Sequence, residues 1–295
     1  MSAPAVPPVA AIDEARLLRA RRRHAAGHAA AARVPREIAG RLLEHLLPIR
    51  REPAHVLDLG AGDGFLTEAL EGRYPRARVT ALEPCLPLLG SRPRRLRERL
   101  LGGGRRLCAG TGALPLAGAS TDMVCSNLAL SGSPDLPAVL AECRRVLRHG
   151  GVLMLSVLGP DSLVELRAAW QSVDGYPHVH PFPDMHDVGD ALVGAGFSDV
   201  VVDVERLTVE FHGFMEMLRE LRAAGGGNSL HGRCQGLTTP RRLQAVREAL
   251  MERTGGRDDR LTAEVVYAHA WAVDAPGVAV AAPRLTPSGG PPRSA

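Results

Sequence analysis

Residues 58 to 64 have the types and spacing of a ligand-binding loop: Asp58, Gly60, Gly62 and Gly64 stand at every second position in "VLDLGAGDGFL". Alternate glycines let the backbone turn sharply after a strand and approach a ligand closely, because no Cβ stands in the way. The helix expected next would offer free N–H groups and the positive end of its dipole. Loops that bind the pyrophosphate of a dinucleotide have the spacing G-x-G-x-x-G, and here the third glycine comes one residue earlier. A carboxylate just before the loop would also repel a pyrophosphate. Asp58 therefore suits an ammonium-bearing ligand.

A second acidic residue, Glu83, ends the apolar run "VTALE" 25 residues later. A carboxylate at the end of a strand can accept hydrogen bonds from both hydroxyls of a ribose. A nucleoside with an ammonium group and a free ribose indicates S-adenosylmethionine. The glycines alone would also fit an ordinary strand-to-helix turn, so Glu83 is the residue that favours the nucleoside.

The elements that must position these residues alternate along the chain, with short apolar runs separated by segments of helical periodicity. This alternation predicts an α/β fold with a doubly wound, mostly parallel sheet. We expect strands at 55–60, 78–84, 105–110, 121–130, 151–159, 199–211 and 261–273, and helices at 65–74, 87–101, 135–151, 161–173, 185–197, 213–228 and 240–254.

Helical pattern also precedes the first strand, at 14–32 and 34–49. The Pro/Ala-rich residues 1–12 and the Pro/Gly-rich residues 273–295 are predicted to be a disordered leader and tail. The predicted organisation is one domain over 13–272. Its core spans 54–159, and substrate-side insertions lie at about 160–183 and, before the last strand, about 212–260.

Composition limits the classes of partner. All 36 basic residues are arginine and the net charge is only +4, so arginine clusters are weak evidence for nucleic acid here. No apolar stretch is long enough to span a bilayer, and we expect no membrane association. The five cysteines have no CxxC spacing and predict reduced thiols, which favours a cytoplasmic protein.

Residues 56–158 resemble a class I S-adenosylmethionine-dependent methyltransferase domain. "VLDLGAGDG" is similar to the first motif of that family, and "LPLAGASTDMVCSNLAL" to its strand-four motif. In the family the adenine is flanked by residues after the third strand, and the end of the fourth strand lines the methionine end. The resemblance implies that S-adenosylmethionine binds Asp58, Gly60, Ala61, Gly62, Gly64, Glu83, Pro84, Gly110, Thr111 and Asn127.

A narrower resemblance covers most of residues 36–272. "GPDSLVELRAAW", "HVHPFPDMHDVGDALVGAGF", "VDVERLTVEF" and "LRELRAAGGGNSLHGR" are similar to the malonyl-acyl-carrier-protein O-methyltransferases of biotin synthesis. The resemblance implies methylation of the free carboxylate of malonyl-acyl-carrier protein, or of another malonyl thioester. A carboxylate is already ionised at neutral pH, so we expect no acid–base residue. The substrate-binding candidates are Asn228, Arg233 and His180.

The sequence departs from these families at three places. Gly110 and Gly112 stand where the loop after the third strand usually carries Asp-x-Glu. Ser131 and Gly132 stand where an aromatic residue is usual, and His28 replaces a tyrosine that closes over the ligand. Two alternatives therefore stay open: a methyltransferase with another acceptor, and a catalytically weak relative acting as a binding factor, since a mitochondrial complex I assembly factor shares this layout.

Two arginine-rich segments, 91–106 and 238–248, are candidates for docking an acidic carrier protein. His178, His180 and His186 lie close together in sequence, but Pro181 and Pro183 interrupt the regular spacing that a metal site needs, and we expect no metal.

Overall fold

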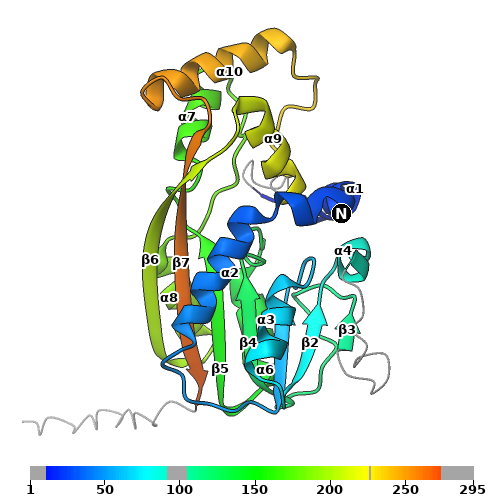
Figure 1. The fold of residues 1–295 in the computed structure, drawn as a ribbon. Coiled ribbons are helices and arrows are strands. Elements are labelled where there is room, and N and C mark those ends of the chain that lie inside the picture. Colours follow the sequence, from blue (N-terminus) through cyan, green and yellow to red (C-terminus); the bar gives the residue numbers. More distant parts are fainter. Residues whose placement is uncertain (1–10, 92–104, 226, 274–295) are drawn as a thin grey trace, which may run out of the picture.

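The computed structural model describes residues 11–91, 105–225 and 227–273 of the chain. Within these residues the strands form one seven-stranded sheet in the order β3-β2-β1-β4-β5-β7-β6, with β7 antiparallel to both of its neighbours (Figure 1). The predicted mostly parallel sheet is thus confirmed. The strands are β1 (His55–Leu59), β2 (Arg78–Leu82), β3 (Arg105–Leu107), β4 (Thr121–Asn127), β5 (Leu147–Leu158), β6 (Ser198–Glu210) and β7 (Arg260–Ala272).

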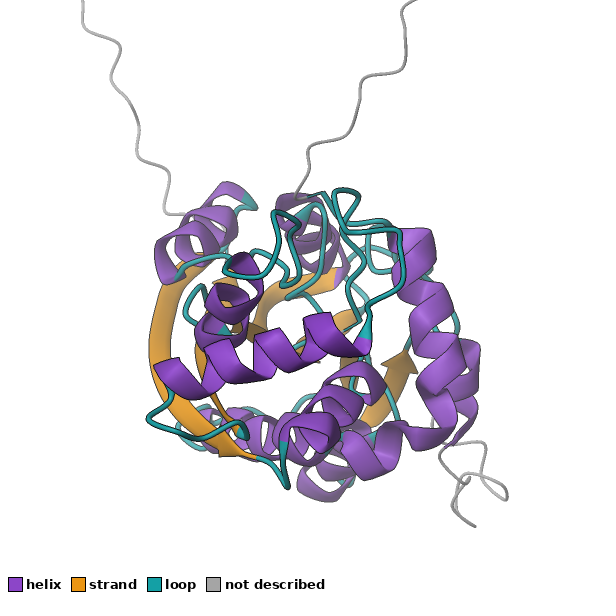
Figure 2. Ribbon diagram, turned by 90° about the horizontal axis from the view of Figure 1, so that it is seen from above, coloured by secondary structure: helices purple, strands orange, loops and turns teal. Residues whose placement is uncertain are grey.

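Helices cover both faces of this sheet, and viewed from above they surround the strands (Figure 2). The described helices are α1 (Glu14–Ala31), α2 (Arg33–His45), α3 (Phe65–Arg73), α4 (Leu86–Ser91), α6 (Leu136–Val146), α7 (Val164–Gln171), α8 (Met185–Gly194), α9 (Phe214–Ala223) and α10 (Pro240–Arg253). The helix predicted over 87–101 continues outside the described residues after Ser91.

Each face has its own apolar core. On one face α2 and α3 contribute Ile38, Leu42 and Leu70, which pack against β1 and β4. On the other, α6 and α8 contribute residues such as Leu140 and Leu192. Strands buried on both faces explain why the sequence of the parallel core consists of continuous apolar runs rather than alternating ones.

A third apolar cluster lies beyond the ends of β6 and β7, where α7, α9 and α10 pack together at the top of Figure 1. Trp170, Phe214 and Leu250 are buried there. The two insertions predicted on the substrate side therefore fold as a single helical layer over one end of the sheet.

The boundary between α6 and β5 differs from the prediction. The helical pattern extends to Gly151, yet α6 ends at Val146 and β5 begins at Leu147, which pairs with Thr121 of β4. A Cβ on Gly151 would lie 2.9 Å from the carbonyl oxygen of Arg148, so this glycine permits a close backbone approach within a bulged strand. It does not end a helix.

The N-terminal helix α1 lies beside α9 and α4 rather than on a face of the sheet. Ile12, within the predicted leader, forms an isolated bridge with Leu230. Residues 1–10 and 274–295 lie outside the described residues. In the described chain, no helix combines the length and the apolar composition that crossing a membrane requires.

Candidate active site

The glycine loop between β1 and α3 requires glycine at its first turn. Gly60, Gly62 and Gly64 have φ angles of +78°, +55° and +85°. A Cβ on Gly60 would lie 2.1 Å from the Cβ of Ala129, which follows β4. The left-handed conformation costs other residues about 1–2 kcal/mol. Strain and a steric clash therefore both exclude side chains at Gly60.

The Asp58 carboxylate is buried at the end of β1. Its Oδ2 accepts a hydrogen bond of 2.5 Å from the hydroxyl of Thr67 in α3. Asp58 lines the main cavity together with Gly60, Ala61 and Gly62, whereas Gly64 faces a small adjoining pocket. An acidic group and bare backbone thus meet at one end of the cavity.

Glu83 is fully buried at the end of β2, and its carboxylate connects three elements. Its Oε1 accepts the N–H of Cys85 at 2.8 Å, and its Oε2 accepts the N–H of Gly62 at 3.0 Å. Oε2 also accepts a hydrogen bond of 3.1 Å from the Arg21 guanidinium of α1. Arg21 therefore occupies a position from which a ribose hydroxyl would reach Glu83.

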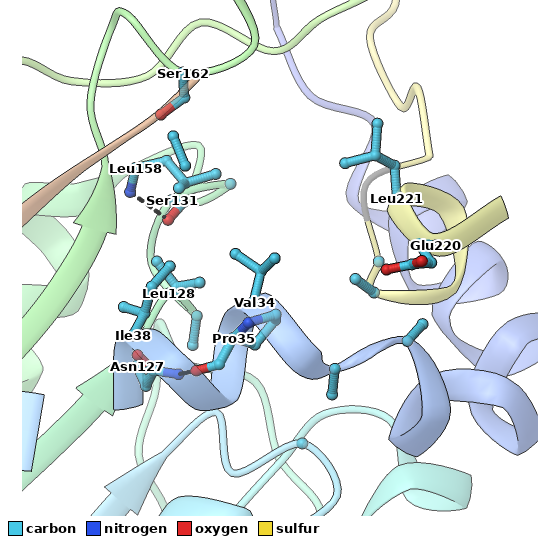
Figure 3. Close-up of a pocket in the computed structure, with 18 of the residues that line it drawn as sticks. Val34, Pro35, Ile38, Asn127, Leu128, Ser131, Leu158, Ser162, Glu220 and Leu221 are labelled. Carbon is cyan, nitrogen blue, oxygen red and sulfur yellow. Dashed lines mark hydrogen bonds between the residues drawn. The ribbon is translucent and has the colours of Figure 1, made fainter. Parts of the chain in front are cut away.

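Asn127, at the end of β4, is held on both sides. Its Nδ2 donates to the carbonyl oxygen of Pro35 at 2.9 Å, and its Oδ1 accepts from the Ser156 hydroxyl at 2.8 Å (Figure 3). Asn127 lines the cavity, but both polar atoms of its side chain form hydrogen bonds that join β4 to α2 and β5. The adjacent backbone is the part that a ligand can use.

The loop after β3 is open. Gly110 and Gly112 are exposed, and a Cβ on either would meet nothing within 4 Å. Pro84, between Glu83 and Cys85, accepts a weak contact of 3.7 Å from the Cys108 thiol, so the end of β2 and this loop are adjacent. The backbone does not require glycine here, in contrast to Gly60.

Beyond the glycine loop the cavity continues into an apolar compartment and reaches a total volume of about 310 Å³. Figure 3 shows Val34 and Ile38 of α2 on one side and Leu221 of α9 facing them across the opening. Phe211, after β6, and Leu166 of α7 line the same compartment. The helical layer thus encloses the end of the cavity that lies away from β1.

His178 and His180 line this compartment in different ways. His178 stacks on Trp170, with ring centroids 3.7 Å apart, and contacts Asp174 at 3.0 Å. The Nε2 of His180 accepts the N–H of Ser229 at 3.1 Å. Burial lowers the pKa of His180, which keeps its ring neutral and able to accept that hydrogen bond.

The structure does not bring the other two predicted substrate residues to the cavity, since neither Asn228 nor Arg233 is among the described residues that line it. Asn228 Nδ2 donates to the carbonyl oxygen of Pro177 at 2.8 Å, and Arg233 Nη1 donates to that of Leu230 at 2.8 Å. Both side chains hold the loop that follows α9. They support the compartment from outside.

The comparisons with known proteins agree with this geometry. Residues 57–155 match the model of a methyltransferase domain. The malonyl-acyl-carrier-protein O-methyltransferase of Gallionella capsiferriformans is 43% identical over 268 residues, which cover 88% of this chain and 91% of that protein. The one of Laribacter hongkongensis is 44% identical over 270 residues, covering 88% and 89%.

The chain belongs to the malonyl-acyl-carrier-protein O-methyltransferase family. It is an S-adenosylmethionine-dependent O-methyltransferase. The YcgJ protein of Bacillus subtilis shares the fold with a TM-score of 0.58, at 13% identity and over 81% of this chain and 99% of that one. A Haemonchus contortus N-methyltransferase, solved with S-adenosylhomocysteine, also shares the fold, with a TM-score of 0.50 and 13% identity. The match covers 79% of this chain and 52% of that one.

Two residues that line the same cavity, Arg36 and Arg21, were not singled out in the sequence, and a third, His28, was noted only as a departure from the family pattern. Arg36 of α2 forms an ion pair with Asp63 at 2.6 Å, and its buried Nε has no hydrogen-bond partner among the described residues. His28 Nδ1 of α1 donates to the carbonyl oxygen of Ala223 of α9 at 3.0 Å, and its ring lies beside Gly62. Arg21 covers Glu83. The two arginines did not stand out in the sequence, because arginine is frequent throughout this chain.

The methyltransferase fold places the remaining departures from the family pattern in context. Ser131, which stands where an aromatic residue is usual, is buried, and its hydroxyl accepts the N–H of Leu158 at 2.9 Å (Figure 3). This hydrogen bond connects the segment after β4 to the end of β5. The part of the chain that the structure describes contains no group of three His, Cys, Asp or Glu side chains able to hold a metal ion.

Proposed function

We propose that this protein methylates the free carboxylate of a malonyl group carried by acyl carrier protein, a step of biotin precursor synthesis. One observation carries the proposal: a single cavity joins the glycine loop to an apolar compartment enclosed by α7, α9 and the segment 178–182. Family membership supports the acceptor, because relatives that carry this name align over most of the chain.

The residues at the glycine-loop end fit S-adenosylmethionine, which supplies the methyl group when bound. Gly60 and Ala61 offer a backbone cradle that a Cβ would fill. We assign Asp58 to the ammonium group, Glu83 to the ribose, and the orphaned Nε of Arg36 to the methionine carboxylate. Completing the proposed set are Gly62, Gly64 and Asn127 around the methionine end and Pro84, Gly110 and Thr111 around the adenine.

The apolar compartment suits an acceptor that needs no deprotonation. A malonyl carboxylate is ionised at neutral pH and is itself the nucleophile. Catalysis then consists of holding its oxygen in line with the methyl group and excluding water. Leu221 and Phe211 exclude water, and His180 is our candidate for orienting the acceptor, with Asn228 and Arg233 holding the loop behind it.

The proposal places the reaction in the cytoplasm. All five cysteines are free thiols in the structure, and Cys85, Cys125 and Cys143 are buried. Burial raises the pKa of the Cys143 thiol to about 12, so it stays protonated and unreactive. A reducing compartment is in keeping with this cysteine usage.

The test uses the full chain with S-adenosylmethionine labelled in its methyl group. Carrier protein loaded with malonyl should acquire a base-labile methyl ester, whereas carrier loaded with acetyl, which lacks the free carboxylate, should not. Expression of the chain should also let a biotin auxotroph that lacks the methyltransferase grow without biotin. Absence of label on malonyl-carrier protein, with growth only on added biotin, would contradict the proposed acceptor.

One observation favours a second candidate, a relative with weak or no catalysis. Gly110 and Gly112 leave the adenine side open where carboxylates are usual in the family. Losing one hydrogen bond to the adenine costs about 1–3 kcal/mol, or roughly tenfold to a hundredfold in affinity. Calorimetric titration separates the two candidates, because a binding factor would show no heat with millimolar S-adenosylmethionine.

A further inference from the structure

Helix α1 has a face of exposed arginines. Arg16, Arg19 and Arg23 follow one another at spacings of three and four residues, which places them on one side of the helix. In the described part of the chain, no ion pair with a carboxylate includes any of the three. The carboxylate of the N-cap residue Asp13 offsets part of this positive charge, because it interacts electrostatically with Arg16 and Arg19. The three arginines outnumber it, so this side of α1 remains positive.

The loop after α9 brings a fourth arginine, Arg233, to this face. The loop is fastened to the start of α1, since Asp13 N donates to Ser229 O at 2.7 Å and Arg16 Nε donates to Asn228 O at 3.1 Å. Burial and then the charge of Arg233 lower the pKa of Arg16, so the two guanidinium groups are close enough to repel each other. We call Arg16, Arg19, Arg23 and Arg233 the arginine face.

The arginine-rich segment at 238–248 is different. Within α10, Arg242 forms an ion pair with Asp174, and Arg247 forms one with Asp258. The nearby Glu248 and Glu252 add negative charge to the same helix. Its arginines are used to hold α10 onto the helical layer. The other basic segment, 91–106, lies mostly outside the described residues.

The arginine face and the active-site cavity lie on different sides of the same helix, α1. Leu17 and Arg21, on the same helix, line that cavity, and so do Ala224 and Gly225 at the end of α9. Figure 1 shows α1 next to α9, at the gap between the sheet and the helical layer. A protein bound to the arginine face would therefore be separated from the cavity by the width of α1, about 10–12 Å, and a flexible acyl tether would have to pass around this helix.

We propose that the arginine face of α1 is the docking surface for an acidic carrier protein, an inference that rests on the proposed function. Like charges held together cost free energy within the monomer, and carboxylates of a partner would relieve that repulsion. Complementary charge at the rim of an interface mainly accelerates association and makes it dependent on salt.

The test compares two double variants with the same change in charge. R19E/R23E reverses two exposed arginines of the arginine face, and R241E/R253E reverses two exposed arginines of α10 as the control. Binding of fluorescently labelled acyl carrier protein is followed by anisotropy at low and physiological salt. We expect R19E/R23E to weaken binding at low salt at least about tenfold and to flatten its salt dependence, with less than about twofold change in R241E/R253E.

Activity provides an independent readout. R19E/R23E should raise KM for malonyl-carrier protein while leaving the KM for S-adenosylmethionine and the rate with a malonyl thioester of free pantetheine unchanged. Equal carrier affinity in R19E/R23E and the wild type would overturn the docking surface, as would equal loss in the control. A single-stranded oligonucleotide serves as a second binding partner in the same assay. If R19E/R23E lost affinity for the oligonucleotide but kept its affinity for the carrier protein, the docking surface would likewise be overturned.

The docking surface and the proposed function fail in different ways. A wild-type chain that binds the carrier through the arginine face but transfers no methyl group refutes the proposed function and leaves the docking surface standing. A chain that methylates malonyl-carrier protein equally well with and without Arg19 and Arg23 refutes the docking surface and leaves the function standing.

Discussion

The cavity has a cofactor end and an acceptor end, and they are built from different parts of the polypeptide. At the end that we assign to the cofactor, Gly60 and Gly62 line the cavity, and a buried carboxylate, Glu83, holds the loop. At the acceptor end side chains such as Phe211 and Leu221 enclose the space. A backbone cradle tolerates almost no substitution, whereas an apolar wall can be rebuilt with other side chains of similar size. The comparison predicts that substitutions at the two ends have separable effects.

The largest effect is expected for Gly60→Ala. Its Cβ would clash with that of Ala129, and its left-handed backbone would be strained. Together these should remove more than about 2 kcal/mol of S-adenosylmethionine binding or stability, measured by calorimetry and thermal melting. Ala129→Gly in the same chain should restore part of the loss by removing the clash. Gly110→Ala is the matched control and should change little, because open space surrounds that position.

A smaller effect is expected at Glu83. Glu83→Gln should weaken S-adenosylmethionine binding roughly tenfold to a hundredfold, since an amide accepts fewer hydrogen bonds than a carboxylate. Arg21→Ala removes the guanidinium that contacts Glu83 and should leave the affinity unchanged or improve it. Equal weakening by both substitutions would show that Arg21 binds the ligand and does not compete with it.

At the acceptor end, Leu221→Ala should lower kcat/KM for malonyl-carrier protein about tenfold without altering S-adenosylmethionine affinity. The side chain is only partly buried and faces the compartment, so the loss of packing is modest (Figure 3). Kinetics with the acceptor varied and calorimetry with S-adenosylmethionine measure the two effects. A parallel fall in cofactor affinity would mean that the ends of the cavity are not independent.

The smallest effect concerns pH and the segment that carries His180. Burial holds the pKa of His180 below its usual value of 6.5, and the pKa of His178 is also lowered by burial. Between the lowered and the usual pKa the unfolded chain binds more protons, so stability is complete above about pH 6.5 and falls as the pH decreases through that window. We expect this loss of stability to be smaller than the effects of the substitutions above.

Thermal melting between about pH 7.5 and 5.5 measures this loss. His180→Gln keeps a hydrogen-bond acceptor for Ser229 without a titratable ring, and its melting temperature should depend less on pH. An unchanged pH dependence in this variant would place the titration at another group.

The predicted fold was accurate where one pattern dominated. The apolar runs of β1, β2 and β4 are buried by helices on both faces, and two of these helices, α2 and α6, have a clear apolar side. The end of α6 was predicted too late, because "RVLRHGG" suits a helix with a glycine stop and only pairing with Thr121 makes Leu147 a strand residue. Local propensity loses to sheet pairing there.

The sequence by itself determined the turn from β1 to α3, because Asp58 and the alternate glycines follow one another within seven residues, a short-range feature, and the assignment of this turn to a cofactor stays a prediction. It could not show that Arg36 and Arg21 reach this turn from α2 and α1, or that Asn228 and Arg233 support the acceptor end from outside. Those positions depend on how distant segments pack against each other. The same holds for charge, because only the tertiary structure pairs Arg242 and Arg247 of α10 with carboxylates and leaves Arg19 and Arg23 of α1 exposed.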